Sequence, residues 1–492
     1  MPVNREASAS LFSSRTTWGP RPFARGRLSA VPTGFVIVTL SKFPRLFCMK
    51  IVCLSLFSVL LLGGSAFGQS SSQVPSPDAA MFRGNLEHTG VYRAQGVPKF
   101  SQIRWKFHTD GQVISSPAVA NGMIFVGSTD GNLYAVDLES GKQKWKLFTG
   151  VRVTSSPAVE NGVVYFGSYS GRFYAVDAVS GKLKWKFQTE GEKRFEGKHL
   201  HGSEPAAETM PDPFDFYLSS PALWSGAVYF GSGDGNVYAL DAATGTLKWK
   251  FHTGDVVHAS PAISDGSLFI GSWDSYFYAL DATSGKEQWR FKTGEDHDTY
   301  NQVGIQSSAA VMDGVVYFGC RDSNFYALDA RTGEKKWAFN NKGSWVITSP
   351  AVQAGKVYFA TSDTAVIYGM DAGTGIPIFS LKFDSWPLFS SPAIAGGMLY
   401  IGSHQGKLIA IDLATQKPAW TFETDAARKN GPGLTRPDGT PDYEAAFGDS
   451  FYEIMVIGLS KMMSVGAMLS SPVVVNNVIY VGSTDGFLYA LM

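Results

Sequence analysis

Seven side chains in the second half of the sequence have the chemistry to hold a flat, polar ligand. Indole rings stack on planar groups, a guanidinium or imidazolium attracts anions, and carboxylates accept hydrogen bonds or bind a cation. The candidates are Trp273, Asp274, Arg321, Asp322, His258, Trp345 and Trp386. They are far apart along the chain, so they can form one binding site only if the fold brings them together.

Two loops contain side chains that could ligate a metal ion. The first has His199, His201, Glu204 and Glu208, and the second is the run Glu295-Asp-His-Asp298. Zinc and calcium use such imidazole and carboxylate ligands, but hydrated surface loops have the same composition, so we predict no metal site. The sequence also lacks a G-x-S-x-G, P-loop or H-E-x-x-H motif, and we predict no catalytic residue.

The element that must position these side chains is a repeat of about 40 residues. Its clearest copy is SSPAVANGMIFVGSTDGNLYAVDLESGKQKWKLFTG, residues 115–150. We expect four short strands in it, at 115–119, 123–128, 132–137 and 144–148, joined by glycine-containing turns. Pro117 lies inside the first of these, which should therefore be a sheet edge. The middle strands are apolar on both faces, as expected for sheets that are covered on both sides.

The repeat occurs eight times. Its marker, GS-x-D-G or a variant, stands at 127–131, 167–171, 231–235, 271–275, 319–323, 361–364, 402–406 and 482–486. The last copy ends at Met492 without a fourth strand, whereas an unpaired fourth-strand sequence, Arg104-Trp-Lys-Phe107, precedes the first copy. We therefore predict an all-β, eight-bladed β-propeller with four-stranded blades, in which this N-terminal strand completes the C-terminal blade.

A tryptophan recurs in the fourth strand, and we predict that each copy is buried between blades as a structural residue. The copies are Trp105, Trp145, Trp185, Trp249, Trp289, Trp337 and Trp420, with Phe379 in the sixth blade. The motif A-x-D-x-x-[ST]-G-x-x-x-W, as in Ala135 to Trp145, resembles the tryptophan-docking repeat of pyrroloquinoline-quinone (PQQ)-type eight-bladed propellers. The lead-in from Met81 to Gly90 is also similar to that of this family.

The resemblance implies three kinds of function: outer-membrane assembly factor B (BamB-like) lipoproteins, PQQ-dependent dehydrogenases and sensor domains. A dehydrogenase of this family is expected to use PQQ, calcium, a carboxylate base and an adjacent Cys-Cys pair. The sequence has no Cys-Cys pair and no C-x-x-C-H haem site. Asp274 and Asp322 recur in most blades as turn residues. We therefore expect a non-catalytic binding scaffold without a cofactor. The alternatives are a PQQ-dependent, alcohol-type dehydrogenase with calcium, or a small-ligand sensor.

Three insertions interrupt the repeat, at 190–218, 294–306 and 424–468. Each connects the fourth strand of one blade to the first strand of the next, so we expect all three at one mouth of the central channel, beside the candidate ligand-binding residues. In the third insertion, Ser450 and Glu453 form a capping box before a helix that is apolar on all sides. We predict that this helix docks on the ring or on a partner.

The N-terminal region has the composition of an export signal. We interpret residues 1–48 as a mis-assigned extension, 49–68 as a cleavable signal peptide, 69–80 as a linker and 81–492 as the propeller. No cysteine directly follows the apolar run, so we expect no lipid anchor. The run is short and ends in Gly63-Gly64, so we expect no transmembrane span in the mature chain.

The charge distribution argues against a nucleic-acid partner. The chain has 42 Lys+Arg and 42 Asp+Glu residues, and the basic excess lies in the first 68 residues, so the predicted propeller is mildly acidic. We predict a monomeric periplasmic or secreted protein. Its expected partners are envelope proteins or peptide segments, held by strand addition at sheet edges or by loops at the mouth.

Overall fold

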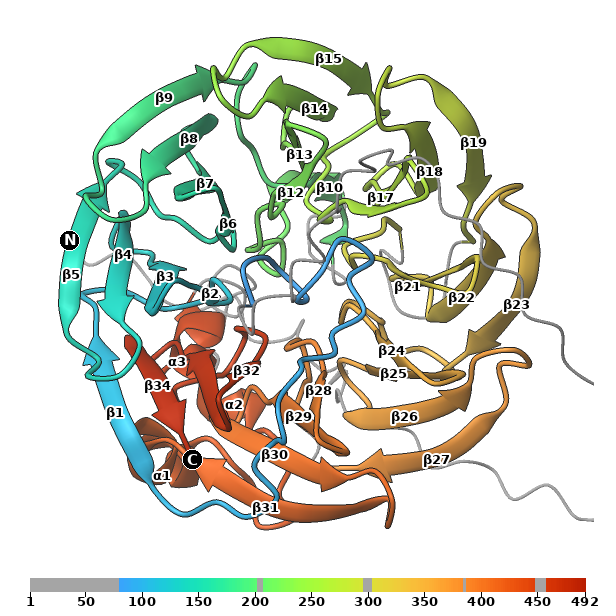
Figure 1. The fold of residues 1–492 in the computed structure, drawn as a ribbon. Coiled ribbons are helices and arrows are strands. Elements are labelled where there is room, and N and C mark those ends of the chain that lie inside the picture. Colours follow the sequence, from blue (N-terminus) through green and yellow to red (C-terminus); the bar gives the residue numbers. More distant parts are fainter. Residues whose placement is uncertain (1–78, 201–206, 295–302, 384–385, 447–456) are drawn as a thin grey trace, which may run out of the picture. The chain divides into compact units, whose positions relative to one another are not determined.

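The computed structural model describes residues 79–200, 207–294, 303–383, 386–446 and 457–492, all within the compact unit Gln73–Met492. These residues form a ring of eight four-stranded antiparallel sheets around a central axis (Figure 1). In each sheet the strands follow one another from the axis to the rim. The predicted all-β, eight-bladed propeller is therefore confirmed. The predicted extension and signal peptide lie outside the described residues.

Seven blades are continuous in sequence. Blade 1 has β2 (Ala118–Ala120), β3 (Met123–Gly127), β4 (Asn132–Asp137) and β5 (Gln143–Phe148); blade 2 has β6 (Ala158–Glu160), β7 (Val163–Ser168), β8 (Arg172–Asp177) and β9 (Leu183–Gln188). Blade 3 has β12 (Ala222–Trp224), β13 (Ala227–Gly231), β14 (Asn236–Asp241) and β15 (Leu247–His252); blade 4 has β16 (Ala262–Ser264), β17 (Ser267–Gly271), β18 (Tyr276–Asp281) and β19 (Glu287–Lys292). Blade 5 has β20 (Ala310–Met312), β21 (Val315–Gly319), β22 (Asn324–Asp329) and β23 (Lys335–Asn340); blade 6 has β24 (Ala351–Gln353), β25 (Lys356–Ala360), β26 (Val366–Asp371) and β27 (Pro377–Lys382). Blade 7 has β28 (Ala393–Ala395), β29 (Met398–Gly402), β30 (Lys407–Asp412) and β31 (Lys417–Glu423).

Blade 8 is completed by the N-terminal strand, as predicted. Its inner strands are β32 (Val473–Val475), β33 (Val478–Gly482) and β34 (Phe487–Leu491), and its outer strand is β1 (Ile103–His108). β1 pairs antiparallel with β34, with Trp105 opposite Ala490 and Phe107 opposite Leu488. The ring is thereby closed by hydrogen bonds between the two ends of the described chain.

The innermost strands differ from the prediction. Each is only three residues long and begins directly after the marker position, which is a proline in seven blades and Ala309 in blade 5, so Pro117 precedes β2 and does not lie inside it. Proline has no N–H to give to a strand ladder, and its ring fixes φ, so the ladder starts at the next residue. The middle strands are buried on both faces, as in β4, where five of six residues are buried.

The docking tryptophans lie in the grooves between neighbouring blades. The indole N–H of Trp249 donates to the carbonyl oxygen of Ala282 in the next blade at 3.0 Å. A Cβ at Gly285 would lie 2.6 Å from the same ring, and this glycine has a φ of +72°, so both contact and conformation require glycine there. The seven tryptophans are half-buried and not buried as predicted, because they belong to the outermost strands, but each indole N–H is bonded to a backbone carbonyl oxygen.

A closed ring of eight serines surrounds the axis where the chain enters each blade. The backbone N–H of each serine donates to the hydroxyl oxygen of the serine in the next blade, at 2.8–3.2 Å. The members, in order, are Ser116, Ser156, Ser220, Ser260, Ser308, Ser349, Ser391 and Ser471, and Ser471 donates to Ser116. This ring holds the eight blade entrances in register.

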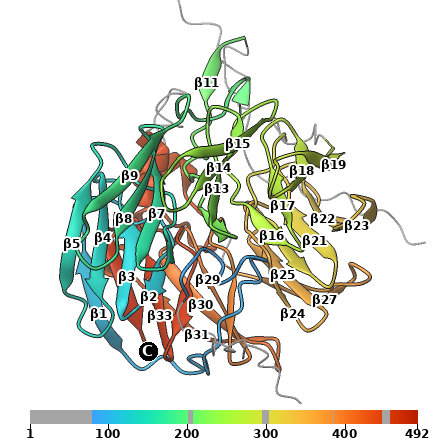
Figure 2. The same cartoon turned by 45° about the horizontal axis from the view of Figure 1, so that its top comes forward.

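The segment before β1 crosses the channel beyond the serine ring (Figures 1 and 2). Its carbonyl oxygens accept hydrogen bonds from the innermost strands of six blades, from Ala79 with Val119 of blade 1 to Gly90 with Ile394 of blade 7. The innermost strands therefore find hydrogen-bond partners in this segment, which forms the floor of the channel.

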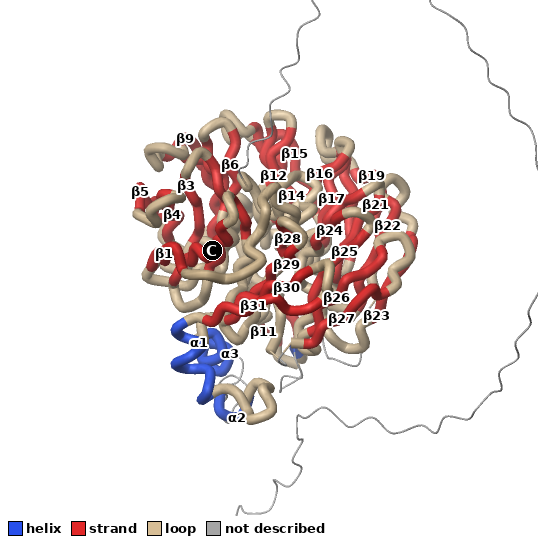
Figure 3. The backbone as a smooth tube through the Cα atoms, turned by 60° about the horizontal axis from the view of Figure 1, so that its bottom comes forward, coloured by secondary structure: helices blue, strands red, loops and turns tan. Residues whose placement is uncertain are grey.

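The insertions carry the remaining regular structure. The first contains a hairpin of β10 (Glu196–Lys198) and β11 (Thr209–Pro211), which projects from the ring in Figure 2. The third contains α1 (Asp425–Asn430), a 3₁₀ turn (Gly431–Gly433), α2 (Tyr443–Ala446) and α3 (Leu459–Met463), which gather beside β31 (Figure 3). The predicted helix is seen only at α3, because residues 447–456, including the predicted capping box, lie outside the described residues.

Candidate functional site

The described parts of all three insertions meet over one mouth of the channel. Phe216 of the first insertion and Met463 of the third belong to one apolar cluster. Gln306, at the end of the second insertion, donates from its side-chain amide to the carbonyl oxygen of Phe214 at 3.0 Å. The predicted common mouth therefore exists, and the insertions cover it.

Three of the candidate residues come together in a buried stack at this mouth. Arg321, in the turn between β21 and β22, lies between two indole rings, with its guanidinium carbon 4.2 Å from the Trp273 ring centroid and 4.1 Å from that of Trp345. Its Nη1 atom is 2.6 Å from Asp212 Oδ2, and Nη2 donates to Gln306 Oε1 at 2.9 Å. Arg321 and Asp212 are both fully buried, so the charge pair is shielded from water.

The stack is extended on both sides by side chains of the first insertion. Phe195 lies parallel to Trp273, with ring centroids 4.4 Å apart and planes at 10°. Phe214 meets Trp345 edge-on, with centroids 5.7 Å apart. Both faces of the Trp273 ring are therefore covered, one by Phe195 and the other by the Arg321 guanidinium.

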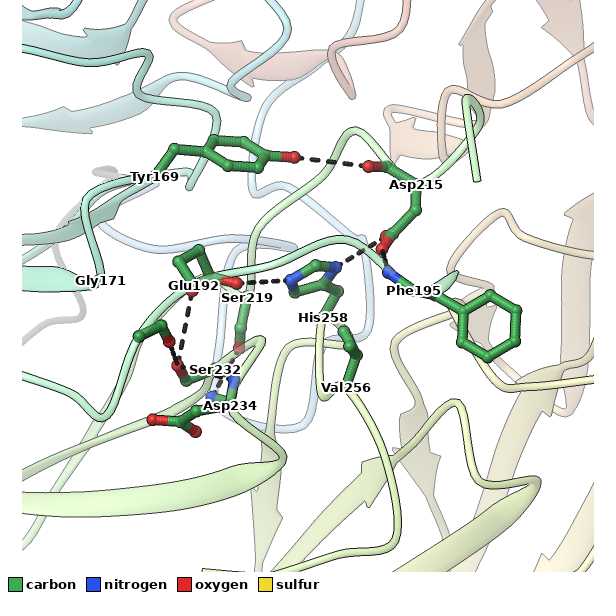
Figure 4. A network of polar contacts seen from close by, with 12 residues as sticks. Tyr169, Gly171, Glu192, Phe195, Asp215, Ser219, Ser232, Asp234, Val256 and His258 are labelled. Atoms are coloured by element: carbon green, nitrogen blue, oxygen red, sulfur yellow. Dashed lines mark hydrogen bonds and ion pairs between the residues drawn. The ribbon is translucent and has the colours of Figure 1, made fainter. Parts of the chain in front are cut away.

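A fourth candidate, His258, is held between two carboxylates of the same insertion (Figure 4). Its Nδ1 atom is 2.7 Å from Asp215 Oδ1, and its Nε2 atom is 2.8 Å from Glu192 Oε1. Asp215 also accepts from the backbone N–H of Phe195 at 2.7 Å. Burial alone would lower the pKa of His258, but the charges and hydrogen bonds of Asp215 and Glu192 outweigh it and raise the pKa to about 10. The imidazole is thus protonated at neutral pH and donates on both sides.

The candidate carboxylates Asp274 and Asp322 have other partners. Asp274 Oδ2 accepts from the backbone N–H of Gly254 at 2.7 Å and from the Tyr278 hydroxyl at 2.6 Å. Asp322 makes the matching contacts one blade further on, including one to the Tyr326 hydroxyl. Both carboxylates link a turn to the following loop, as aspartates do at the same position in other blades.

Trp386 lies outside the Arg321 stack. It is 1% exposed and packs under the third insertion with Leu434, Met462 and Val465. Its indole N–H is buried and has no hydrogen-bond partner among the described residues. The fold therefore unites Trp273, Arg321, Trp345 and His258 under the first insertion and places Trp386 in a separate cluster.

The space left along the axis is small. The cavity on the axis passes through the serine ring, from Phe82 of the floor to Tyr217 and His258 at the mouth, and has a volume of about 40 Å³. A water molecule needs about 10–15 Å³ of such space, so the cavity accommodates only a few waters. The Thr154 hydroxyl faces this region without a protein partner among the described residues.

Comparison with known proteins identifies the family. A family model described as outer membrane protein assembly factor BamB matches residues 99–208, 218–421 and 321–453. The chain belongs to this BamB family. No curated protein matches the sequence.

Solved structures similar to this BamB-family propeller include both a BamB protein and dehydrogenases. BamB from Moraxella catarrhalis is 16% identical with a TM-score of 0.56, covering 80% of this chain and 97% of its own. A europium-containing methanol dehydrogenase is 16% identical with a TM-score of 0.63, covering 85% and 98%. Quinohemoprotein alcohol dehydrogenase from Comamonas testosteroni is 16% identical with a TM-score of 0.62, covering 84% and 80%. At this identity the likeness shows a shared fold.

The quinone and calcium of PQQ-type enzymes do not fit the residues at this mouth as they stand. A planar quinone needs an open stacking face, and the faces of Trp273 are occupied. The one cysteine among the described residues, Cys320, is buried and free, so this part of the chain offers no vicinal pair. The two carboxylates at His258 bind opposite ring nitrogens and do not converge on a common point.

No metal cluster occurs in the described part of the chain. Its His, Cys, Asp and Glu residues form no group of three or more that could hold an ion. Of the sequence candidates, His201, Glu204 and 295–298 lie outside the described residues. Among the helices that the structure describes, none is long and apolar enough to cross a bilayer.

Sequence reasoning missed the acidic half of the site. Glu192, Asp212 and Asp215 lie in an insertion that shows no repeat, so periodicity gave no information about their position. The sequence did contain an indication that acidic partners are present. Arg321 and His258 replace uncharged residues of the repeat near one mouth, and buried cations require nearby acids. The charged first insertion is the nearest source of such acids.

Proposed function

We propose that this BamB-family protein is an exported scaffold that binds polypeptides of the cell envelope, and that it does not act as a quinone-dependent enzyme. The observation that carries the proposal is the filled mouth. Phe195, Asp212, Asp215 and Glu192 occupy the positions around Trp273, Arg321 and His258 where a flat anionic ligand would have to sit. The remaining cavity of about 40 Å³ is too small for such a ligand.

Export is supported by the sequence of residues 49–68, a charged start followed by an apolar run and a small-residue cleavage site. Envelope partners are supported by the family match and by the form of the molecule. On each of the eight outer strands, the alternate backbone N–H and C=O groups that point outward have no strand partner along the rim, and loops project at one mouth. Both features suit the capture of extended polypeptide.

A direct test of partner binding uses a photo-crosslinking residue at Lys198, at the loop end of β10 in the projecting hairpin. The purified protein is mixed with a urea-unfolded outer-membrane β-barrel protein, diluted from denaturant and irradiated. We expect a crosslinked product with the unfolded chain and none with the same chain folded in detergent. Absence of crosslinks here and from positions on the outer strands would contradict the scaffold function.

A quinone dehydrogenase is the second candidate, favoured by the stack of two indoles around a guanidinium, which would suit a planar anion if the first insertion withdrew. The test is to incubate the purified protein with PQQ and calcium, to record the absorbance spectrum and to assay dye-linked alcohol oxidation. We expect neither a bound-quinone spectrum nor turnover. The appearance of both would establish the enzyme and overturn the scaffold proposal.

A further inference from the structure

Six of the eight outer strands carry a cationic side chain beside the docking tryptophan, on both sides in four blades and on one side in β19 (Arg290) and β23 (Lys336). The two solvent-facing positions that flank the docking tryptophan are Arg104 and Lys106 in β1, Lys144 and Lys146 in β5, Lys184 and Lys186 in β9, and Lys248 and Lys250 in β15. Some of these side chains are also paired, as with Lys144 Nζ, 2.9 Å from Asp137 Oδ2. Charged residues on an edge strand oppose pairing with a further strand.

The outer strand of blade 6 lacks this protection. In β27 the flanking positions are Ile378 and Ser380, so its central residues carry no charge. Ile376 and Ile378 are 63% and 39% exposed. β31 of blade 7 is also uncharged at these positions, but it has the small residues Ala419 and Thr421 there. β27 is thus the edge that combines missing charge with exposed branched side chains.

β27 is also less firmly tied to its neighbour than the other outer strands are. Six docking indoles donate their N–H to a carbonyl oxygen of the next blade, and the indole of Trp420 in blade 7 donates to Val97 in the segment before β1. Phe379 has no such donor, and the docking glycine of the next blade is replaced by Gln416, with a φ of +57°. Phe379 instead packs toward Gly369, where a Cβ would lie 2.3 Å from its ring. The junction between blades 6 and 7 therefore lacks this hydrogen bond.

We propose that the outer edge of β27 beyond Pro377, from Ile378 to Lys382, is the docking site for an extended strand of a partner polypeptide. The unpaired backbone groups of an edge strand are complementary to another strand. Exposed Ile378 favours an apolar residue opposite it. Lys382, exposed and without an ion pair among the described residues, favours an acidic residue at that end of the incoming strand. This inference rests on the proposed scaffold function and adds the edge and the chemistry of the partner.

The test copies the edge of blades 1–3 onto blade 6. The variant carries Ile378→Lys and Ser380→Lys, and the matched control carries Ala419→Lys and Thr421→Lys in β31. The probe is a fluorescein-labelled peptide of alternating valine and threonine with a glutamate at each end, so that one glutamate lies near Lys382 in either strand direction, and binding is followed by anisotropy. Both variants should melt like the wild-type protein, because lysine occupies the same solvent-facing positions in other blades.

We expect the β27 variant to lose at least about tenfold in affinity for the peptide, through lost apolar contact and lost access to the edge, and the β31 control to bind like wild type. Equal binding by all three proteins, equal loss in both variants, or no binding by the wild-type protein would overturn the proposal. The oligomeric state of the wild-type protein and of the β27 variant should also be measured by sedimentation. If the wild-type protein is a dimer and the β27 variant is a monomer, a second copy of the chain occupies this edge. Crosslinking from Lys198 does not depend on this edge. If the β27 variant still crosslinks to the unfolded chain from Lys198, the scaffold function is supported even when the docking site at β27 is wrong.

Discussion

Replacing Arg321 by methionine should destabilise the protein substantially, because it leaves the Asp212 carboxylate buried without its cation. Both side chains are fully buried and lie 2.6 Å apart. Breaking such a pair by removing one partner costs about 3–5 kcal/mol. Loss of the contacts with Trp273 and Trp345 adds about 1–2 kcal/mol, which the packing of the methionine thioether between the same rings partly offsets. We expect a net loss of about 4 kcal/mol.

This loss can be measured by chemical and thermal unfolding. At about 2.1 cal/mol/K per residue, a domain of this size has an unfolding entropy of roughly 0.9 kcal/mol/K, so 4 kcal/mol corresponds to about 4–5 °C in Tm. The decisive measurement is a double-mutant cycle with Asp212→Asn, which removes the negative charge that Arg321 balances in the wild-type protein. If the charge pair is the cause, Asp212→Asn should recover about 2 kcal/mol in the methionine background and cost stability in the wild-type protein. Additive effects of the two substitutions would refute the reasoning.

Further predictions concern the docking tryptophans, the buried imidazole and the two ends of the molecule. Trp249→Phe should cost about 1 kcal/mol for the lost hydrogen bond and Trp249→Ala about 3 kcal/mol; equal losses in urea titrations would disprove a role for the N–H. The pKa of His258 is raised above its unfolded value, so its contribution to stability is fully present below about pH 6.5 and is lost as the pH rises through about 10; unfolding measured from pH 7 to 11 should show this loss, and the His258→Gln variant should not. Replacing 425–465 by a Gly/Ser linker should leave the ring folded, shift Trp386 fluorescence to the red and abolish partner capture; retained capture would show that the third insertion serves only as cover. A protein that starts at Met49 should be exported as efficiently as the full chain, and retention in the cytoplasm would contradict the interpretation of residues 1–48.

The ring could be predicted because its determinants are periodic. Tryptophan, glycine and proline recur at fixed offsets, and a gap in that pattern is itself informative. The missing fourth strand after Tyr489 and the surplus one at Trp105 together indicate the closing pair from the pattern of residues alone. Pro117 was wrongly placed inside the first strand, because residue type alone does not show where the ladder begins.

Only the site residues that lie on the repeat could be predicted from the sequence. Arg321 and His258 stood out because they depart from the repeat, and the fold places them at one mouth. Their partners Asp212 and Glu192 lie in a loop whose path depends on tertiary contacts, and no local pattern encodes such contacts. Asp322 and Trp386 were predicted as ligand-binding residues because of their side-chain chemistry. The same side chains also have structural uses: the aspartate closes a turn, and the indole packs under the third insertion.

The floor of the channel has a consequence for how the molecule is made. The carbonyl oxygen of Ala79 needs only blade 1, but that of Gly90 needs Ile394 of blade 7, about 300 residues further along the chain. At 5–20 residues per second the ribosome takes roughly 15–60 s to produce that partner. Gly90 is therefore translated early but finds this hydrogen bond late, and β1 must wait longer still, for β34. The ring cannot be finished blade by blade during synthesis, and its open form, with unpaired inner and outer strands, must survive until the C-terminal blade is complete.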